Sequence, residues 1–181
     1  MRFGNRLAAT PCVLALTLSA CAADVQDPKE PGTASVRLKP VTAPLVEPTL
    51  QRTVYVPAYS SIYLGRDINQ NMVQLSVTLS IRNVSTQYPL VLNFVRYYDS
   101  SGNQVRDYVD GPSELGPMAS VEFVIQKADT AGGPGANFLV RWAGAADIDE
   151  PVIEAVMIGQ SASAGFSFTS VGRVVKDPPS P

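Results

Sequence analysis

The chain has 181 residues, of which 45% are hydrophobic and 17% are charged, and its formal net charge at pH 7 is −2. This length and composition suit one packed domain with flanking segments rather than a disordered polypeptide. The sequence contains no histidine, which excludes Ser-His-Asp catalysis, Cys-His catalysis and histidine-ligated zinc. Because the net charge is slightly negative, the chain also lacks the excess of positive charge that is typical of nucleic-acid-binding proteins.

The first 20 residues, 1–20, have the features of a signal peptide. Two arginines precede an apolar run at residues 7–18, which is too short for a transmembrane helix. The run ends in Leu18-Ser19-Ala20-Cys21, which resembles a bacterial lipobox: an aliphatic residue, two small residues and the cysteine that receives the lipid. We therefore expect cleavage between Ala20 and Cys21 and lipidation of Cys21. The alternative is an ordinary signal peptide cleaved nearby, with Cys21 incidental.

Lipidation would define both the charge and the location of the mature chain. Cleavage before Cys21 removes Arg2, Arg6 and Cys12, so the formal net charge changes from −2 to −4 and no second cysteine remains for a disulfide. The lipobox resemblance implies a diacylglycerol on Cys21, and Ala22 in the next position favours the outer membrane where the envelope has two membranes. We therefore expect a lipid-anchored protein of the bacterial cell envelope, on the outer membrane and facing the periplasm where there are two membranes.

Composition divides the rest of the chain into three segments. Residues 21–52 are rich in Pro, Ala, Thr and Glu without an apolar period, which predicts a disordered tether after the lipidated cysteine. Residues 53–176 alternate between apolar runs and turn residues, which predicts a single folded domain. Residues 177–181 contain three prolines and predict a disordered tail.

The domain has the pattern of β-strands. At residues 73–81 every odd-numbered residue is apolar and every even-numbered residue is polar, which is typical of a strand with one buried face. Further strands are predicted at 53–57, 61–64, 88–98, 120–126, 137–142, 152–158 and 166–175. Turn residues separate these runs, including one turn predicted at Gly165. We expect an antiparallel β-sandwich of about seven or eight strands, immunoglobulin-like, with a small β-barrel as the alternative.

The same alternation selects candidate core residues. Phe138, Val140 and Trp142 would share one face of a strand and are the principal core anchors. The residues expected opposite or beside them are Val77, Leu79, Phe94, Phe123, Val156 and Phe168.

Five short segments of the domain are similar to a known bacterial family. They are residues 56–63 (VPAYSSIY), 79–83 (LSIRN), 97–102 (YYDSSG), 132–138 (GGPGANF) and 151–158 (PVIEAVMI). In order and spacing they resemble the domain-of-unknown-function family DUF3124 over residues 53–175. The resemblance implies small envelope or lipoprotein-type members and brings no established activity.

Two loops contain acidic residues that could bind a metal ion. Asp99, Ser101 and Asn103 alternate as oxygen ligands do in calcium loops. However, no Glu closes the loop, and Asp-Ser-Ser-Gly-Asn is also a good hairpin turn. A second acidic group, at residues 147–150, has the composition of a solvated loop. We expect a turn at residues 99–103 and a solvated loop at residues 147–150. A Ca²⁺ site at Asp99, Ser101 and Asn103 remains the alternative. We expect no other cofactor.

Tyrosines supply a second kind of candidate site. Tyr59, Tyr63, Tyr97 and Tyr98 lie in or beside predicted strands, where their amphipathic rings could form a binding surface. Tyrosine is also a common strand residue, so a structural role is the favoured interpretation.

Two predicted strands contain an arginine, Arg96 in one and Arg141 in the other. A guanidinium in a sheet needs either solvent or a carboxylate partner, such as Glu122 or Glu154. We expect an ion pair within the sheet rather than capture of a ligand.

Two hypotheses for function follow from these features. The favoured one is a membrane-anchored, non-catalytic binding or assembly module for an envelope protein or polymer, without nucleic-acid binding. The alternative is an envelope enzyme that uses carboxylates or a bound metal, for example on glycans. The absence of histidine and of a free thiol in the mature domain favours the first.

Overall fold

The computed structural model describes residue 1 and residues 38–41, 49–65 and 72–176. Ala20, Cys21, most of the predicted tether and the predicted tail at 177–181 lie outside these residues, so their assignments stay predictions. Within the described segments, no helix is long and apolar enough to cross a bilayer.

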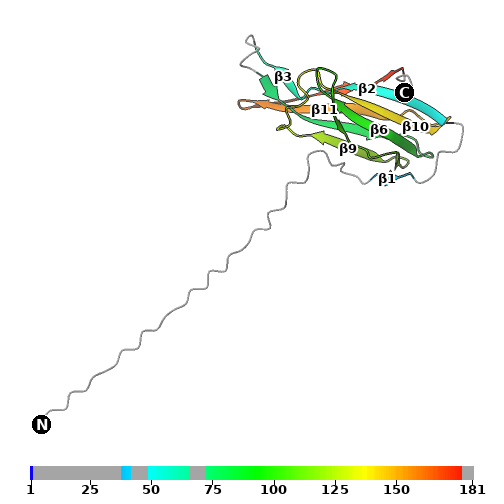
Figure 1. Ribbon diagram of the computed structural model, residues 1–181, viewed down its shortest axis with the longest axis horizontal. Coiled ribbons are helices and arrows are strands. Elements are labelled where there is room, and N and C mark those ends of the chain that lie inside the picture. The colour runs from blue at the N-terminus through cyan, green and yellow to red at the C-terminus, as the bar shows by residue number, and fades with distance from the viewer. Residues whose placement is uncertain (2–37, 42–48, 66–71, 177–181) are drawn as a thin grey trace.

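All regular structure in the described residues is β-strand, arranged in two main antiparallel sheets and a small hairpin (Figure 1). The seven-stranded sheet contains β1 (Lys39–Pro40), β8 (Ser113–Leu115), β6 (Leu90–Tyr98), β10 (Asn137–Ala145), β2 (Thr49–Pro57) and β13 (Arg173–Val175) in that order, with β7 (Gln104–Asp107) paired to β6. The four-stranded sheet contains β12 (Ala164–Val171), β11 (Val152–Ser161), β5 (Ser76–Arg82) and β9 (Ser120–Ile125). The hairpin pairs β3 (Ser61–Tyr63) with β4 (Met72–Gln74).

The predicted antiparallel β-sandwich is confirmed, and neither main sheet of the described residues closes into a barrel. The described residues contain thirteen strands, more than predicted, for two reasons. β1, β7 and β8 have only two to four residues each, too few to show a period in the sequence. The runs predicted at 73–81 and 166–175 each divide into two strands, β4 and β5 in the first and β12 and β13 in the second.

From β2 to β11, each successive long strand lies in the other main sheet: β2, β6 and β10 in one, and β5, β9 and β11 in the other. In the immunoglobulin fold, by contrast, the first two strands, A and B, lie in the same sheet. The likeness to the immunoglobulin fold is therefore one of architecture and not of strand order.

The sheet begins earlier in the chain than the predicted domain boundary at residue 53. β2 starts at Thr49, and β1 pairs with β8 through Lys39 opposite Glu114 and Pro40 opposite Ser113. β1 and the first four residues of β2 lie within the segment 21–52 that was predicted to be a tether. Pro40 is accommodated because β1 is an edge strand, where a missing backbone N–H is tolerated.

The core lies between the two main sheets and contains most of the predicted anchors. The predicted residues that the structure buries completely or almost completely are Val77, Leu79, Phe123, Phe138, Val140 and Trp142. On β5, the odd-numbered apolar residues face the core, as the alternation at 73–81 predicts.

Two of the predicted anchors are wrong and one lies at the margin of the core. Phe94 faces away from the core because of a bulge in β6, which is described with the site below. Val156 faces outward because β11 buries Ile153, Ala155 and Met157 instead, and the run 152–158 is too uniformly apolar to distinguish the two faces. Phe168 packs against the core but is only half-buried, since β12 is an edge strand.

The turn predicted at Gly165 is also wrong. Gly165 lies within β12, and the chain reverses at residues 162–163 instead. Ala162 adopts a positive φ of 52° there, a conformation usually taken by Gly or Asn in such turns. The sequence therefore carries no conventional signal for this turn.

Candidate functional site

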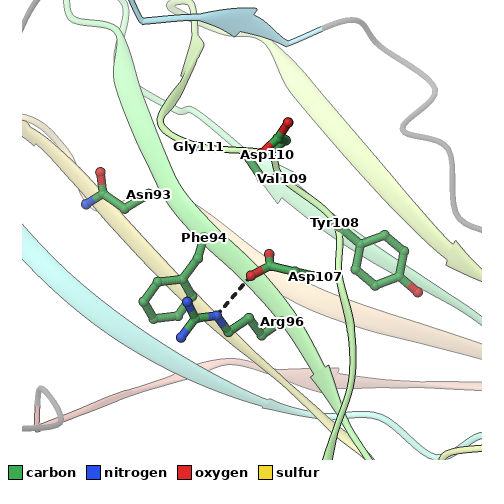
Figure 2. A pocket seen from close by; sticks show the side chains of 8 residues that line it. All are labelled: Asn93, Phe94, Arg96, Asp107, Tyr108, Val109, Asp110 and Gly111. Atoms are coloured by element: carbon green, nitrogen blue, oxygen red, sulfur yellow. Dashed lines mark hydrogen bonds and ion pairs between the residues drawn. The ribbon is translucent and has the colours of Figure 1, made fainter. Parts of the chain in front are cut away.

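A polar cleft of about 510 Å³ lies on the outer side of β6, beside the hairpin that β6 forms with β7 (Figure 2). We call it the polar cleft. It is lined by Asn93, Phe94, Arg96, Asp107, Tyr108, Val109, Asp110 and Gly111. Its volume lies within the range of about 300–1,000 Å³ that is common for small-ligand sites.

A β-bulge in β6 turns the lining residues toward the cleft. Leu92 pairs with Trp142 of β10 and Phe94 pairs with Arg141, so Asn93 is an extra residue without a counterpart on β10. Before the bulge the even-numbered residues Leu90 and Leu92 belong to the core between the sheets, and after it the odd-numbered residues Val95 and Tyr97 do. The shift directs Phe94 and Arg96 away from the core.

The Arg96 guanidinium is held between a carboxylate and an aromatic ring. Its Nε donates a hydrogen bond to Oδ2 of Asp107 at 3.0 Å, and its Cζ lies 4.2 Å from the centroid of the Phe94 ring. Figure 2 shows this arrangement at the centre of the cleft. The hydrogen bond to Asp107 raises the pKa of Arg96, so the group is a permanent cation. Because both partners are more than a third exposed, the pair contributes only about 0–1 kcal/mol to stability, and its main effect is to orient the guanidinium.

The charge of the cleft is negative overall. Asp110 forms no ion pair with any residue that the structure describes. The cleft therefore contains two carboxylates, Asp107 and Asp110, and one guanidinium, that of Arg96. The Tyr108 ring points away from Arg96 (Figure 2) and packs instead on Phe123 and Phe138, with ring centroids 5.3 and 5.9 Å apart. The cleft therefore presents hydrogen-bonding groups of both kinds and disfavours anions.

The structure shows why sequence reasoning chose other partners for Arg96. In the β6–β7 hairpin, Arg96 lies directly opposite Asp107. Counting outward from the turn at 99–103 would have placed Arg96 opposite Arg106, because the sequence gives no sign of the bulge between Tyr97 and Tyr98 that shifts the register by one residue. Glu154, the partner suggested for a strand arginine, instead lies 3.9 Å from Arg82.

Asp99, from the alternative calcium site, acts within a hairpin turn. Its Oδ1 accepts hydrogen bonds from the backbone N–H groups of Ser101 and Asn103, both at 2.8 Å, and its Oδ2 accepts one from Nδ2 of Asn103 at 2.9 Å. These hydrogen bonds lower the pKa of Asp99, and the bond from the Asn103 side chain has the largest effect. The described residues include no group of three or more His, Cys, Asp or Glu side chains that could hold a metal ion.

The acidic group at 147–150 is divided between separate interactions. Oδ2 of Asp147 accepts a hydrogen bond from the Tyr88 hydroxyl at 3.2 Å. Glu150 lies 3.4 Å from Nε of Arg52 and lines a smaller, mainly apolar pocket of about 200 Å³ beside Trp142. Neither carboxylate lines the polar cleft.

The four tyrosines proposed as a binding surface do not form one surface. Tyr59 and Tyr63 are exposed, but Tyr97 is fully buried, because neighbouring residues of β6 face opposite sides of the sheet. The Tyr97 ring lies in the core, 5.3 Å from the Phe138 ring, while Tyr98 is half-buried on the other side. Tyr97 is therefore a core residue.

The hydroxyl of Tyr97 lies directly beneath the glycine-rich loop. A Cβ at Gly132 would lie 1.7 Å from this hydroxyl, so only glycine fits there. The hydroxyl makes no hydrogen bond of normal geometry within the described part of the chain. Burial raises the pKa of Tyr97 to about 12, although the Ser60 side chain acts in the opposite direction.

Asn83 is a structural residue to which sequence reasoning assigned no role in the fold. It is only 2% exposed, and its Nδ2 lies within hydrogen-bond distance of the carbonyl oxygens of Tyr88 at 2.9 Å, Leu115 at 3.1 Å and Gly116 at 3.0 Å. Its Oδ1 accepts a hydrogen bond from the backbone N–H of Ser85 at 3.0 Å. We call this group the Asn83 junction, because it ties the β5–β6 loop to the end of β8.

Comparison with known proteins supplies a family and no activity. No curated protein matches the chain significantly. The crystal structure of Thermotoga maritima 1070 is similar at 13% sequence identity and a TM-score of 0.40, covering 67% of this chain and 92% of that chain. The family model described as "Protein of unknown function (DUF3124)" matches residues 51–175, which is more than half of the chain. The chain therefore belongs to the DUF3124 family of proteins of unknown function.

Proposed function

We propose that this protein is a lipid-anchored envelope protein whose β-sandwich is a non-catalytic binding module, with the polar cleft as its ligand site. The observation that carries the binding role is the cleft itself, where a fixed guanidinium, two carboxylates, an amide and an aromatic ring share one concavity. The lipobox resemblance at Leu18-Ser19-Ala20-Cys21 supports the anchor. A tether followed by a sandwich would present the cleft to the periplasm.

The chemistry of the cleft fits a neutral, hydroxyl-rich ligand, such as an envelope glycan. Each sugar hydroxyl both donates and accepts hydrogen bonds, and Asn93, Arg96 and Asp110 offer donors and acceptors within the same cleft. The partly exposed Phe94 ring adds apolar contact for a sugar face. Anionic polymers fit less well, because carboxylates outnumber guanidinium groups in the cleft.

An enzyme that acts on glycans is the second candidate, because Asp107 and Asp110 line the same cleft. Glycosidases need one carboxyl group as an acid and another as a base or nucleophile. Asp107 already accepts a hydrogen bond from Arg96, which favours the binding role over this one.

The anchor is tested by membrane fractionation of the full chain. We expect Cys21→Ser to move the protein from the membrane fraction to the soluble fraction, since one acyl chain contributes about 0.8 kcal/mol per buried CH₂. Cys12→Ser is the matched control, because Cys12 lies within the apolar run and should not be lipidated. Membrane retention of the Cys21→Ser protein would contradict the lipid anchor.

The binding role is tested by calorimetric titration with a soluble chitin oligosaccharide, a neutral glycan. We expect Arg96→Ala to weaken binding at least about tenfold, which corresponds to about 1.4 kcal/mol. Arg82→Ala is the control, since Arg82 is also a strand arginine with a carboxylate neighbour but lies in the other main sheet. Equal affinities of the Arg96→Ala variant and the wild-type protein would overturn the assignment of the cleft.

The same oligosaccharide separates binding from catalysis. We expect it to remain intact after prolonged incubation with the wild-type protein, as judged by mass spectrometry. Cleavage that is lost in Asp110→Asn but kept in Asp99→Asn would instead support the enzyme.

A further inference from the structure

Among the described residues, the β12 edge of the four-stranded sheet differs from the other edges of the two main sheets. An exposed edge strand presents unpaired backbone N–H and C=O groups, and proteins usually protect it with short length, charged side chains or proline. Three edge strands, β1, β7 and β13, have two to four residues each and all contain charged residues. The edge strand β9 carries Glu122 within its six residues.

The edge strand β12 has none of these protections. Its eight residues, Ala164–Val171, include no charged residue and no proline. Among the described residues it pairs only with β11. Near its end the Ser170 hydroxyl donates a hydrogen bond to the carbonyl oxygen of Pro57 in β2, so the free part of the edge is residues 164–169. The outward-facing Ile158 on the neighbouring β11 is 55% exposed, which adds an apolar side chain next to this edge.

The central three residues of β12, Phe166-Ser167-Phe168, are symmetric about Ser167. In an antiparallel pair, residues that lie directly opposite each other face the same side of the sheet. If β12 paired with a second β12 about a two-fold axis at Ser167, each Phe166 would lie opposite the other copy's Phe168. These pairs would fall on the inner face, where both rings are half-buried. On the outer face Ser167 would meet Ser167, and Gly165 would meet Thr169.

We propose that β12 is a self-association edge, at which two copies of this chain pair antiparallel about Ser167 and join their four-stranded sheets into one continuous sheet. Two observations select a second copy as the occupant. The aromatic pairs Phe166–Phe168 form twice in that register, and aromatic cross-strand pairs stabilise sheets. No like charges meet, because the strand is uncharged. A closed two-fold dimer also removes the exposed edge from both copies.

The register is tested by cysteine crosslinking in the full chain, with Cys12 and Cys21 replaced by Ser. We expect Ser167→Cys to form an intermolecular disulfide under copper phenanthroline and to give a band at twice the 19.3 kDa of the monomer. Thr169→Cys is the matched control, because it lies on the same strand and face but its two copies would be about 13 Å apart along the strands. This separation exceeds the reach of a disulfide.

Each other outcome overturns the proposal. No crosslink at position 167, or equal crosslinking at 167 and 169, would exclude this register. A crosslinked product of the Ser167→Cys protein with a different mass would indicate an extended segment of another protein on the edge. Light scattering supplies a test independent of cysteine chemistry: Ser167→Lys should convert a particle of twice the monomer mass into a monomer, while Thr78→Lys on the inner strand β5 should not. A wild-type protein that is monomeric at all concentrations would also overturn the proposal.

Discussion

The Asn83 junction and the polar cleft both contain an asparagine, yet the two asparagines have opposite environments. Asn83 is buried, and both polar atoms of its side chain have partners within the fold. Asn93 lies at the cleft, and its side chain makes no hydrogen bond with any residue that the structure describes. Buried polar groups must be paired because water cannot satisfy them, whereas groups on an open cleft keep their bonding capacity for a ligand. The comparison separates polar residues that hold the fold from those available for function.

The largest expected effect is the loss of the Asn83 junction. We expect Asn83→Ala to lower the free energy of unfolding by about 2–4 kcal/mol, because three carbonyl oxygens and one N–H lose their partner. Urea denaturation measures this change. Asn93→Ala is the matched control and should change the stability by less than about 0.5 kcal/mol. Equal losses in the two variants would contradict the distinction between the two asparagines.

Tyr97 sharpens the comparison because its hydroxyl is buried without a normal hydrogen bond. Burial raises its pKa from 10.0 to about 12, so the neutral hydroxyl is favoured in the folded state. This pKa difference adds to the free energy of unfolding below pH 10. The contribution, up to about 2–3 kcal/mol, is lost as the pH rises from 10 toward 12, because the hydroxyl ionises more readily in the unfolded chain. We expect Tyr97→Phe to remove part of this alkaline destabilisation while changing the stability at pH 7 by less than about 1 kcal/mol.

Urea denaturation at pH 8 and pH 11 tests this expectation. Tyr98→Phe is the control, because the neighbouring ring lies on the opposite face of β6. The burial argument fails if both variants follow the wild-type pH dependence.

Gly132 tests how tightly the glycine-rich loop packs on Tyr97. We expect Gly132→Ala to lower the free energy of unfolding by about 1–3 kcal/mol, because the new Cβ would overlap the Tyr97 hydroxyl. In a Tyr97→Phe background the loss should be smaller, since the overlapping oxygen is gone. Gly116→Ala is the control, because no atom lies within 4 Å of a Cβ there. Identical losses in both backgrounds would exclude the hydroxyl as the cause.

The smallest effect on stability is expected in the polar cleft. Asp107→Asn should lower the free energy of unfolding by less than about 1 kcal/mol, because its pair with Arg96 is partly exposed. It should nevertheless weaken glycan binding, since the guanidinium loses its orientation. Glu154→Gln, which disrupts the pair with Arg82 in the other main sheet, should leave binding unchanged. A loss of stability comparable to that of Asn83→Ala would place the Arg96–Asp107 pair among the structural groups.

Local patterns predicted most of the fold and little of the site. The strict alternation at 73–81 identifies β5 and its buried face, because a strand with one solvent face alternates in polarity. The Asp-Ser-Ser-Gly-Asn turn was also predicted, since its hydrogen bonds close within five residues. Phe94 was misplaced because an apolar residue gives no sign that a bulge has turned it outward.

By itself, the sequence determined the all-β class, the turn at Asp99 and the family, because these depend on neighbouring residues and on their order. Only the tertiary structure decided which polar groups meet. The β6 bulge and the β6–β7 register bring Arg96 to Asp107, and the β5–β6 loop carries Asn83 to the carbonyl oxygens at the end of β8. The physical reason is that hydrogen-bond partners and clefts depend on distances in space, and strand pairing sets these between residues far apart in the chain.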